Sequence, residues 1–513
     1  MYTTEALLEE GAPKVRFGRR ERRGAFLGFS WLQIILVSSS AIAFLFTLFT
    51  ATEKLPYLLP LYLVVGGLGA VTYRRESLLT IIGHRLGYFG RKISGQDTYL
   101  RDVWARHEER AIETARVKSE RGTPVKTSTF VMPGALGAVE TFQSAHGGAF
   151  TLDRKNNVVG LTFRVSSEAW PLRDKSAQLA AYDGMVDWMS SLANVPGVSE
   201  VTARIRVDTA ASTELQDYVT ERDAERGDRY AITPELEKEY AELIALGSKR
   251  SMSFSNFVTV GFHLGQMRGD IKQSGGGLPG LGTVLERVAE ALEDSLNQTR
   301  AKVESWLPAP EMQSVLSLTC DPASAAARRE RESGGRRAAM QNPPIMSIQE
   351  HPNRLSIDGS EHATYWITEW PRSEVRTGFL EPLLYAGSAT RVLTLQLRPV
   401  PIHKALTRIT RAQNDIATAQ LVQVKFNQKP TREEQREAEE LDEREEHIAD
   451  GFADVDYRGF VTVSGVDVEE LNRGRMEIET ASQQARIVLG LLWRQQAAAF
   501  MTAALPLAIG GKR

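Results

Sequence analysis

Apolar residues gather near the N-terminus in two runs without a charged side chain. The runs cover residues 24–52 and 55–73, and only Glu53 and Lys54 separate them. A bilayer core of ~30 Å requires ~20 apolar residues in a helix, so each run is long enough to cross it. The connection is short and contains Pro56, which favours an antiparallel arrangement. The pattern predicts an N-terminal transmembrane α-helical hairpin.

Beyond this hairpin, short apolar segments alternate with amphipathic ones. Apolar runs bounded by turn residues predict strands, and longer stretches with a 3.6-residue period predict helices. Their order predicts a cytoplasmic α+β body of ferredoxin-like β-α-β units with a long C-terminal helix. We find no repeat in the sequence of these units. The expected strands are 156–165, 198–208, 253–264, 311–321, 390–400 and 457–465, and the expected helices are 173–194, 283–304 and a long region from 402.

Changes in composition divide the chain into segments. After the hairpin, Leu78, Ile82, Leu86 and Phe89 recur at helical spacing. This amphipathic helix lies either on the inner leaflet of a membrane or at the start of the soluble core. The predicted segments are a basic N-terminus (1–23), the hairpin (24–73), the amphipathic helix with a linker (74–128), an α+β domain (129–325), a flexible basic loop (326–345) and a second α+β domain with long helices (346–513).

Positive charge flanks the predicted hairpin, whereas its connecting loop carries only Lys54. Basic flanks remain on the cytoplasmic side. We therefore predict a multi-pass protein of the bacterial plasma membrane with both termini in the cytoplasm. The residues expected to fix this topology are Arg16, Arg19, Arg20, Arg22, Arg23, Arg74 and Arg75.

Two export signals compete with this interpretation. Residues 41–43 (Ala-Ile-Ala) have the form of a signal-peptidase site, and Arg22 and Arg23 resemble a twin-arginine tag. Apolar sequence continues well beyond residue 43, however, and a second run follows. We therefore expect the segment to be retained as an anchor.

Small residues in the second run predict close helix packing. Gly66 and Ala70 lie one helical turn apart, and such spacing lets two backbones approach each other. Packing within the hairpin and packing against a partner both fit this spacing. Neither run contains an Asp, Glu, Lys, Arg or His residue that would indicate a proton path.

Composition excludes some chemistry. The 513 residues contain 62 Lys and Arg against 64 Asp and Glu, a formal charge of −2. The whole molecule therefore has no electrostatic bias towards nucleic acid, and we expect no sequence-specific binding of it. The single cysteine, Cys320, excludes an internal disulfide and a cysteine-based metal cluster.

No motif in the sequence carries a complete catalytic set. Gly277, Gly282 and Thr283 reproduce phosphate-loop spacing without its lysine, and no apolar strand leads into them. We interpret them as a flexible turn before a helix. The eight histidines form no metal-binding motif, although His351 and His362 lie in one region. Cys320 is expected in the core, at the end of a strand. We predict no enzyme activity, no cofactor and no metal.

Two polar segments are predicted to be exposed. Residues 327–344 are basic and rich in Gly and Pro, as in a solvated loop, with lipid or nucleic-acid contact as the alternative. Residues 431–450 are strongly acidic and predict an exposed helical arm, with partner binding as the alternative.

Parts of the chain resemble components of conjugative type IV secretion systems. The segment from Arg19 to Gln33 is similar to PrgI-type inner-membrane proteins. Residues 131–140 (VMPGALGAVE), 390–406 (TRVLTLQLRPVPIHKAL) and 494–507 (RQQAAAFMTAALPL) resemble the N-terminal, non-ATPase domain of the conjugation motor ATPase. In that family the last motif leads into the ATPase core, whereas this sequence stops soon after it.

The resemblance implies an actinobacterial, non-catalytic structural subunit in the membrane. Its implied partners are the lipid bilayer, a separate hexameric motor ATPase and other channel subunits, and it implies an oligomer. Two other functions remain open: a membrane component of type VII secretion, and a membrane-bound enzyme of unrecognised chemistry.

Overall fold

The computed structural model divides the chain into two compact units. The first, which we call the body, is drawn from Met1–Arg16, Gln96–Pro401 and Ala453–Arg513, and the second from Phe17–Gly95 and Ile402–Phe452. The described residues are 14–15, 31–50, 53, 55–73, 76–101, 123–133, 137–166, 173–208, 236, 238–240, 242–243, 252–324, 345–371, 373–425, 432–449 and 454–509.

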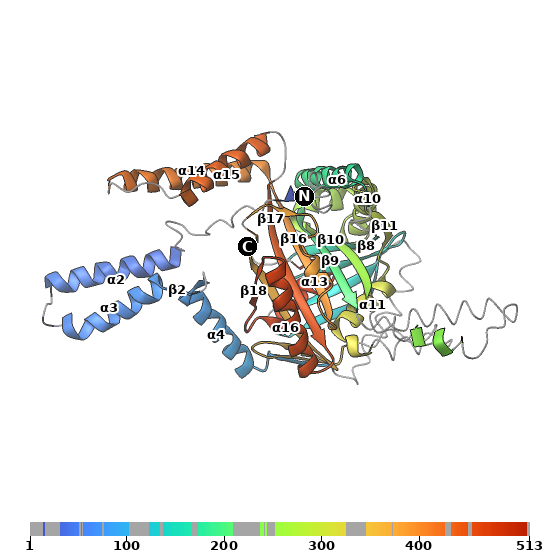
Figure 1. The fold of residues 1–513 in the computed structure, drawn as a ribbon, viewed down its shortest axis with the longest axis horizontal. Coiled ribbons are helices and arrows are strands. Elements are labelled where there is room, and N and C mark those ends of the chain that lie inside the picture. The colour runs from blue at the N-terminus through green and yellow to red at the C-terminus, as the bar shows by residue number, and fades with distance from the viewer. Residues whose placement is uncertain are drawn as a thin grey trace, which may run out of the picture. The chain divides into compact units, whose positions relative to one another are not determined.

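The body is built on one antiparallel sheet (Figure 1). Its main path runs β4-β12-β13-β14-β17-β16-β9-β10-β8-β7-β6-β5, with β11 paired to β8 and β18 paired to β14. The strands are β4 (Thr98–Leu100), β5 (Val125–Met132), β6 (Gly137–Gln143), β7 (Ala149–Asp153), β8 (Val158–Ser166), β9 (Val198–Asp208), β10 (Ser253–His263), β11 (Lys302–Trp306), β12 (Ser347–Glu350), β13 (Leu355–Ile357), β14 (Ser360–Glu369), β16 (Thr390–Val400), β17 (Asp454–Gly465) and β18 (Val488–Leu491). A separate short pair joins β1 (Lys14–Val15) to β15 (Val375–Arg376).

Seven helices pack with this sheet among the described residues of the body. Side chains cap three of them: the Asp174 carboxylate accepts from the Ala177 N–H at α6, His263 Nδ1 accepts from the Gly265 N–H at α9, and Asp467 accepts from the Glu470 N–H at α16. Each cap satisfies an N–H that has no partner within its own helix. The helices are α6 (Lys175–Asn194), α9 (Leu264–Gln273), α10 (Gly277–Gln298), α11 (Ala309–Cys320), α13 (Glu381–Leu384), α16 (Val468–Gln484) and α17 (Gln496–Ala503).

Eight of the fourteen strands form two halves with the same topology. The first half has the strand order β11-β8-β10-β9 and the second has β18-β14-β17-β16. Both share the order strand, helix, two strands, helix, strand and final helix, which is α11 in the first half and α17 in the second. The first half has two helices, α9 and α10, before β11, and the second has β15 before α13 and the segment 402–452 between β16 and β17. The halves join where β9 pairs with β16, and there Arg204 lies opposite Thr394.

The two halves also share a short sequence. Thr162 pairs with Thr259 in the first half, and Thr364 pairs with Thr462 at the equivalent place in the second. In this register the tetrapeptide Phe-Val-Thr-Val occurs at both 257–260 and 460–463. Our expectation that the units share no sequence repeat is therefore wrong at this position.

Three hydrophobic cores fill the body. One lies between the first half and α6, α9 and α10, and another lies between the second half and α13 and α16. The third surrounds α11, α17 and the segment after α17, and it takes in residues from β5 and β6 at one end of the path and from β12 and β13 at the other. The sheet therefore curves into a nearly closed antiparallel barrel around these two helices.

The predicted body of ferredoxin-like β-α-β units with a long C-terminal helix is wrong, because the two halves are not separate α+β units but parts of one nearly closed antiparallel sheet. The finding that overturns it is the single sheet, in which β9 and β16 join segments far apart in sequence. The expected strand at 311–321 is the helix α11, and the C-terminal helix α17 has only 8 residues. Local patterns identified the strands β8, β9, β10, β16 and β17 but not their long-range partners.

The second unit is helical. Its elements are α2 (Trp31–Thr50), α3 (Leu55–Ala70), β2 (Thr72–Tyr73), β3 (Glu76–Ser77), α4 (Leu78–Ile93), α14 (Ile402–Lys425) and α15 (Arg432–Ala449). The acidic segment is thus helical, as predicted, and α15 packs against α14 through Leu441 and Ile448, which are buried.

The expected multi-pass topology with two cytoplasmic termini is wrong. In the part of the chain that the structure describes, α2 alone is long and apolar enough to cross a membrane. The second helix, α3, has 16 residues and at 1.5 Å per residue is about 24 Å long, shorter than a bilayer core of ~30 Å. The chain leaves the helix after Ala70 and enters the β2–β3 turn.

Candidate functional site

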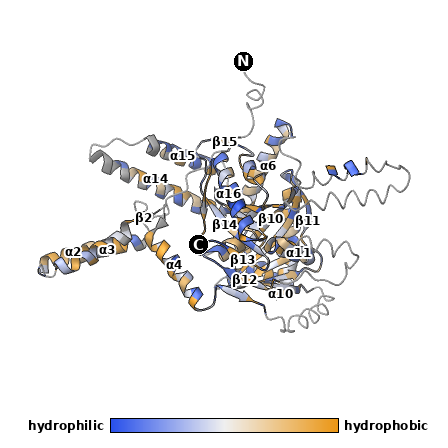
Figure 2. Cartoon of the chain, turned by 60° about the horizontal axis from the view of Figure 1, so that its bottom comes forward, coloured by the Kyte–Doolittle hydropathy of each residue, from blue (hydrophilic) through white to orange (hydrophobic). Residues whose placement is uncertain are grey.

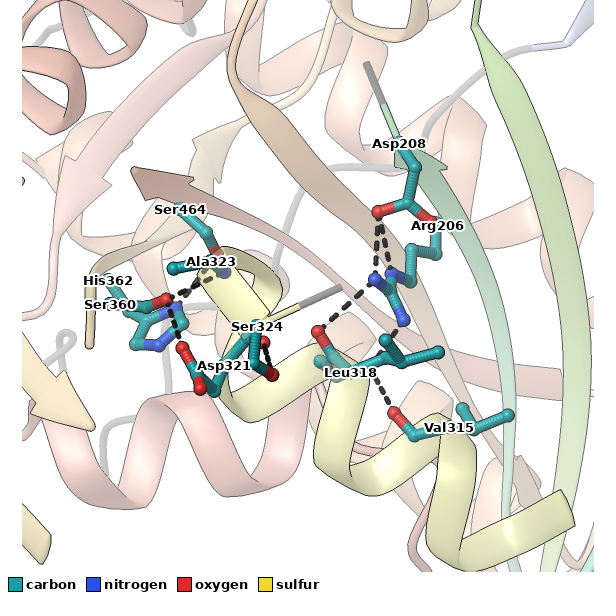
Figure 3. Close-up of polar contacts among 11 residues, drawn as sticks. Arg206, Asp208, Val315, Leu318, Asp321, Ala323, Ser324, Ser360, His362 and Ser464 are labelled. Atoms are coloured by element: carbon teal, nitrogen blue, oxygen red, sulfur yellow. Dashed lines mark hydrogen bonds and ion pairs between the residues drawn. The ribbon is translucent and has the colours of Figure 1, made fainter. Parts of the chain in front are cut away.

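A buried histidine connects the end of α11 to the second half of the sheet (Figure 3). His362 on β14 lies opposite Ser464 on β17, and its Nδ1 is 2.8 Å from the Ser464 Oγ. Its Nε2 is 2.8 Å from the Cys320 carbonyl oxygen. A carbonyl can only accept, so Nε2 carries the proton and Nδ1 accepts from the Ser464 hydroxyl.

The protein environment keeps this histidine neutral. Burial lowers the pKa of His362 to about 4, because the imidazolium would lose its hydration, although the Cys320 carbonyl partly opposes the shift. The Phe500 ring lies 4.6 Å from the imidazole, centre to centre. At neutral pH, His362 is therefore uncharged and links β14 to the end of α11 through its hydrogen bonds.

Beside His362, polar contacts hold the turn that follows α11. The Ser360 hydroxyl donates to the Asp321 carboxylate at 2.8 Å and accepts from the Ala323 N–H at 3.2 Å. Figure 3 shows Asp321 and Ser360 meeting next to His362. These contacts join the turn directly to β14.

An arginine on β9 completes the contacts of α11. Arg206 donates to the Leu318 carbonyl at 3.2 Å and is held by Asp208, whose carboxylate lies 2.8 Å from its Nη2 (Figure 3). The last carbonyls of a helix have no partner within it and carry partial negative charge. A guanidinium at this end therefore stabilises α11.

The end of α17 is held in the same way by Arg204, two residues earlier on the same face of β9. Arg204 donates to the carbonyls of Thr502 at 2.9 Å, Ala503 at 3.1 Å and Leu507 at 3.3 Å. Burial lowers its pKa to about 10, so it stays charged at neutral pH. We call Arg204 and Arg206 the β9 arginine pair.

The segment after α17 crosses the first half at the positions equivalent to His362 and Ser464. Those positions are Gly160 and Gly261, which face each other on β8 and β10. A Cβ atom on Gly160 would lie 2.6 Å from the Ala508 Cβ, and one on Gly261 would lie 3.1 Å from it. In the first half, glycine is therefore required because the segment after α17 crosses these positions. In the second half, the equivalent His362–Ser464 pair lies where α11 ends.

A buried carboxylate lies beside this crossing. Glu200 accepts from Gln396 at 2.7 Å and from Arg398 at 3.3 Å, and it also accepts from the Ile509 N–H. Burial raises the pKa of Glu200, although Arg398 and Arg204 favour its charged form. These contacts fix the segment after α17 at its far end.

The geometry suits holding helices in place better than catalysis. A serine beside a histidine is the arrangement of a nucleophile with its base, but both Ser464 and His362 are buried. The imidazole also donates to a backbone carbonyl, which fixes its tautomer. The side chains of this site donate hydrogen bonds to the carbonyls at the ends of α11 and α17.

A second candidate surface is the pair of apolar helices α2 and α3, which Figure 2 shows in the colours of hydrophobic residues. The Ser40 hydroxyl donates to the Tyr62 carbonyl at 2.8 Å, and the Gln33 amide donates to the Gly69 carbonyl at 3.0 Å. Gly66 faces Ser40, and the closest approach is at Gly69, whose added Cβ would lie 2.8 Å from the Val37 Cγ2. Most side chains on the outer sides of both helices are exposed.

The sequence-predicted residues have different outcomes. Gly66 lies at the α2–α3 contact, whereas the side chain of Ala70 is outside the described residues, as is the predicted basic loop at 326–345 except for its last residue, Ile345, which packs against a hydrophobic core. Cys320 is in the core as predicted, but it ends a helix. The predicted topology arginines Arg16, Arg19, Arg20, Arg22, Arg23, Arg74 and Arg75 also lie outside the described residues.

The glycine-rich motif is part of a helix and not the predicted flexible turn. Helix α10 begins at Gly277, and α9, a helix and not a strand, leads into it. A Cβ on Gly280 would lie 2.5 Å from the Ile271 carbonyl oxygen, so the glycines allow α9 and α10 to pack closely. Across the described residues, no group of three or more His, Cys, Asp or Glu side chains is placed to hold a metal.

The β9 arginine pair and Ser464, the partner of His362, were not predicted from the sequence. The available signal was charge inside an apolar strand: Arg204 and Arg206 alternate with Val and Ile in β9. Charged residues are seldom fully buried without partners, so this alternation marks a polar interior contact.

No family model matches the sequence, and no curated protein matches it.

Proposed function

We propose that this protein is a non-catalytic structural subunit that α2 anchors in a membrane and whose body docks a separate motor ATPase. The machine would be a conjugative, type IV-like translocation system. Membrane anchoring is supported by the structure of α2, and the choice of machine is supported only by the resemblance of the sequence segments described above.

The observation that carries the proposal is the exposure of α2. Ile42 and Phe46 are each 66% exposed and Phe49 is 84% exposed, while only 11% of the apolar window Gln33–Thr50 is buried. A core helix of a soluble protein would bury this surface, because each large apolar side chain contributes ~1.5–3 kcal/mol when removed from water. A lipid environment provides that burial.

The architecture of the body supports a scaffold. The buried side chains of Arg204, Arg206 and His362 hold the ends of α11 and α17 inside one sheet. The two halves are joined through the β9–β16 pairing, and we propose that the body they form is the platform for a partner.

Anchoring is tested by charge placed on the exposed side of α2. In water, Lys at two exposed positions costs little, whereas at the centre of a bilayer helix each costs ~2.5–3.5 kcal/mol. We expect the double variant Ile42→Lys/Phe46→Lys to be lost from membranes washed with alkaline carbonate. The matched control Ile42→Leu/Phe46→Leu should remain. Equal retention of both variants would refute anchoring through α2.

Docking is tested by purification in detergent of the wild-type chain from cells that also produce a conjugation motor ATPase. We expect the ATPase to co-purify as a hexamer and to be absent when the body is omitted. If the chain is anchored through α2 but the ATPase never co-purifies with it, the docking role is refuted and the anchoring role is not.

A further inference from the structure

Helix α4 presents its apolar side to the outside. Leu86 is 67% exposed, Phe89 is 55% exposed and Ile93 is 87% exposed, and Ile82 lies in the same row at spacings of three and four residues. Tyr88, in contrast, is buried, and His84 and Arg91 on its side of the helix are only partly exposed. In a soluble protein the apolar face of an amphipathic helix is the covered one.

The charges of α4 are of one sign. The helix contains Arg85, Arg91 and Lys92 and no acidic residue. Arg85 and Lys92 are exposed, and at 100° per residue they lie along one edge of the apolar row. An apolar row with a basic edge is complementary to a bilayer surface that carries negative headgroups.

The start of α4 is tied to the apolar pair of α2 and α3. The Leu78 N–H donates to the Val71 carbonyl at 3.3 Å, one residue beyond the end of α3. That end of α3 packs near the beginning of α2, where Gln33 contacts Gly69. Gln33 is also the first residue of the apolar window. If α2 crosses a membrane, α4 therefore starts at the level of its surface.

We infer that α4 is an interfacial helix that binds anionic lipid, with Ile82, Leu86, Phe89 and Ile93 among the acyl chains and Arg85 and Lys92 at the headgroups. This inference rests on the proposed function in that it requires α2 to place the chain on a membrane. The lipid is chosen over a protein partner because of the cationic edge and the link to α3.

Site-directed spin labels on the full chain test this assignment. The native Cys320 is fully buried and should not react, so an introduced cysteine is labelled selectively. The test position is Leu86→Cys, and the matched control is Gly87→Cys, which is exposed and turned by about 100° from it. A third label, Phe46→Cys, reports on α2.

In vesicles of phosphatidylcholine with phosphatidylglycerol, we expect the label at 86 to be accessible to oxygen and shielded from a water-soluble nickel reagent. The label at 87 should show the reverse. In phosphatidylcholine alone, or in the Arg85→Gln/Lys92→Gln variant, the shielding at 86 should fall at least about threefold, since each basic residue near an anionic surface contributes a several-fold preference.

The outcomes separate the two proposals. Labels at 86 and 87 that are equally open to the nickel reagent, while the label at 46 is shielded, would overturn the role of α4 and leave anchoring intact. A label at 46 that is itself open to the reagent would refute anchoring. A label at 86 that is immobilised without any lipid would indicate a protein contact in place of the lipid one.

Discussion

Single polar side chains determine how the two interior helices end. Arg204 serves α17 and Arg206 serves α11, although the two residues are neighbours on one face of β9. Replacing either arginine with a residue that cannot donate would leave buried carbonyls without a donor. The free-energy cost of that exceeds the net contribution of the hydrogen bond. His362 adds a neutral donor at the end of α11.

His362 should make stability depend on pH. Its pKa is about 4 in the folded chain and ~6.5 when unfolded, so between these values the unfolded chain binds the extra proton. Stability is therefore complete above pH ~6.5 and falls as the pH drops towards 4. Between pH 7 and pH 4, the wild type should lose about 3 kcal/mol more than His362→Gln, as measured by urea unfolding.

The glutamine variant is the appropriate comparison because it is neutral throughout and its amide can still donate to the Cys320 carbonyl. It should be less stable than the wild type at pH 7, and its free energy of unfolding should change less with pH. Parallel pH profiles for the two proteins would show that His362 does not titrate as a buried base.

At the scale of elements, the approach of α2 and α3 depends on one glycine. An added Cβ at Gly69 would lie 2.8 Å from the Val37 Cγ2 and 3.2 Å from the Gln33 carbonyl oxygen, whereas one at Gly67 would meet nothing within 4 Å. The two positions share a helix, so a comparison between them separates helix propensity from helix packing.

We expect Gly69→Val to separate α2 from α3 and Gly67→Val to leave them packed. The distance between the Ser40 Cβ and an added Cβ at Gly66 is 3.9 Å, which suits a disulfide. In a Ser40→Cys/Gly66→Cys background, Gly69→Val should lower the cross-linking rate about tenfold, since overpacking costs ~1–3 kcal/mol. Equal rates for the two valine variants would contradict the packing shown here.

Helix α11 shows where a sequence pattern was available but misread. Met312, Val315, Leu316 and Cys320 are all buried, and their spacings of three, one and four residues are those of a helix face. The segment was expected as a strand because it is short and apolar. In contrast, the strands β10 and β17 follow from their β-branched residues and were predicted.

At the scale of the molecule, the body is a pair of equivalent halves closed around a shared core. Residues from both ends of the strand path contribute to that core, together with α11 and α17. Each final helix has its end held by residues outside its own sequence neighbourhood, so neither half is complete alone.

This sharing predicts that the halves unfold together. Val260 and Val463 are equivalent positions of the repeated tetrapeptide and both are fully buried. Val260→Ala and Val463→Ala should each lower the free energy of unfolding by roughly 2 kcal/mol. For each variant, hydrogen exchange should show reduced protection of the backbone amides in both β8 and β14.

The control is Met476→Ala on the exposed side of α16, where the side chain is 63% exposed and the change should stay within about 0.5 kcal/mol. A loss of protection confined to the half that carries the substitution would show that the halves unfold separately.

The sequence alone determined several local elements, among them the strands β8, β9, β10, β16 and β17, because alternation reports which side of a segment is covered. It also placed Cys320 in the core and identified the apolar run that forms α2. The tertiary structure decided what local pattern cannot encode: that β9 pairs with β16, that α11 and α17 lie inside the sheet, and that α3 ends too early to span a bilayer core. Strand partners and helix ends depend on contacts between distant residues, and a single sequence records each residue but not its neighbours in space.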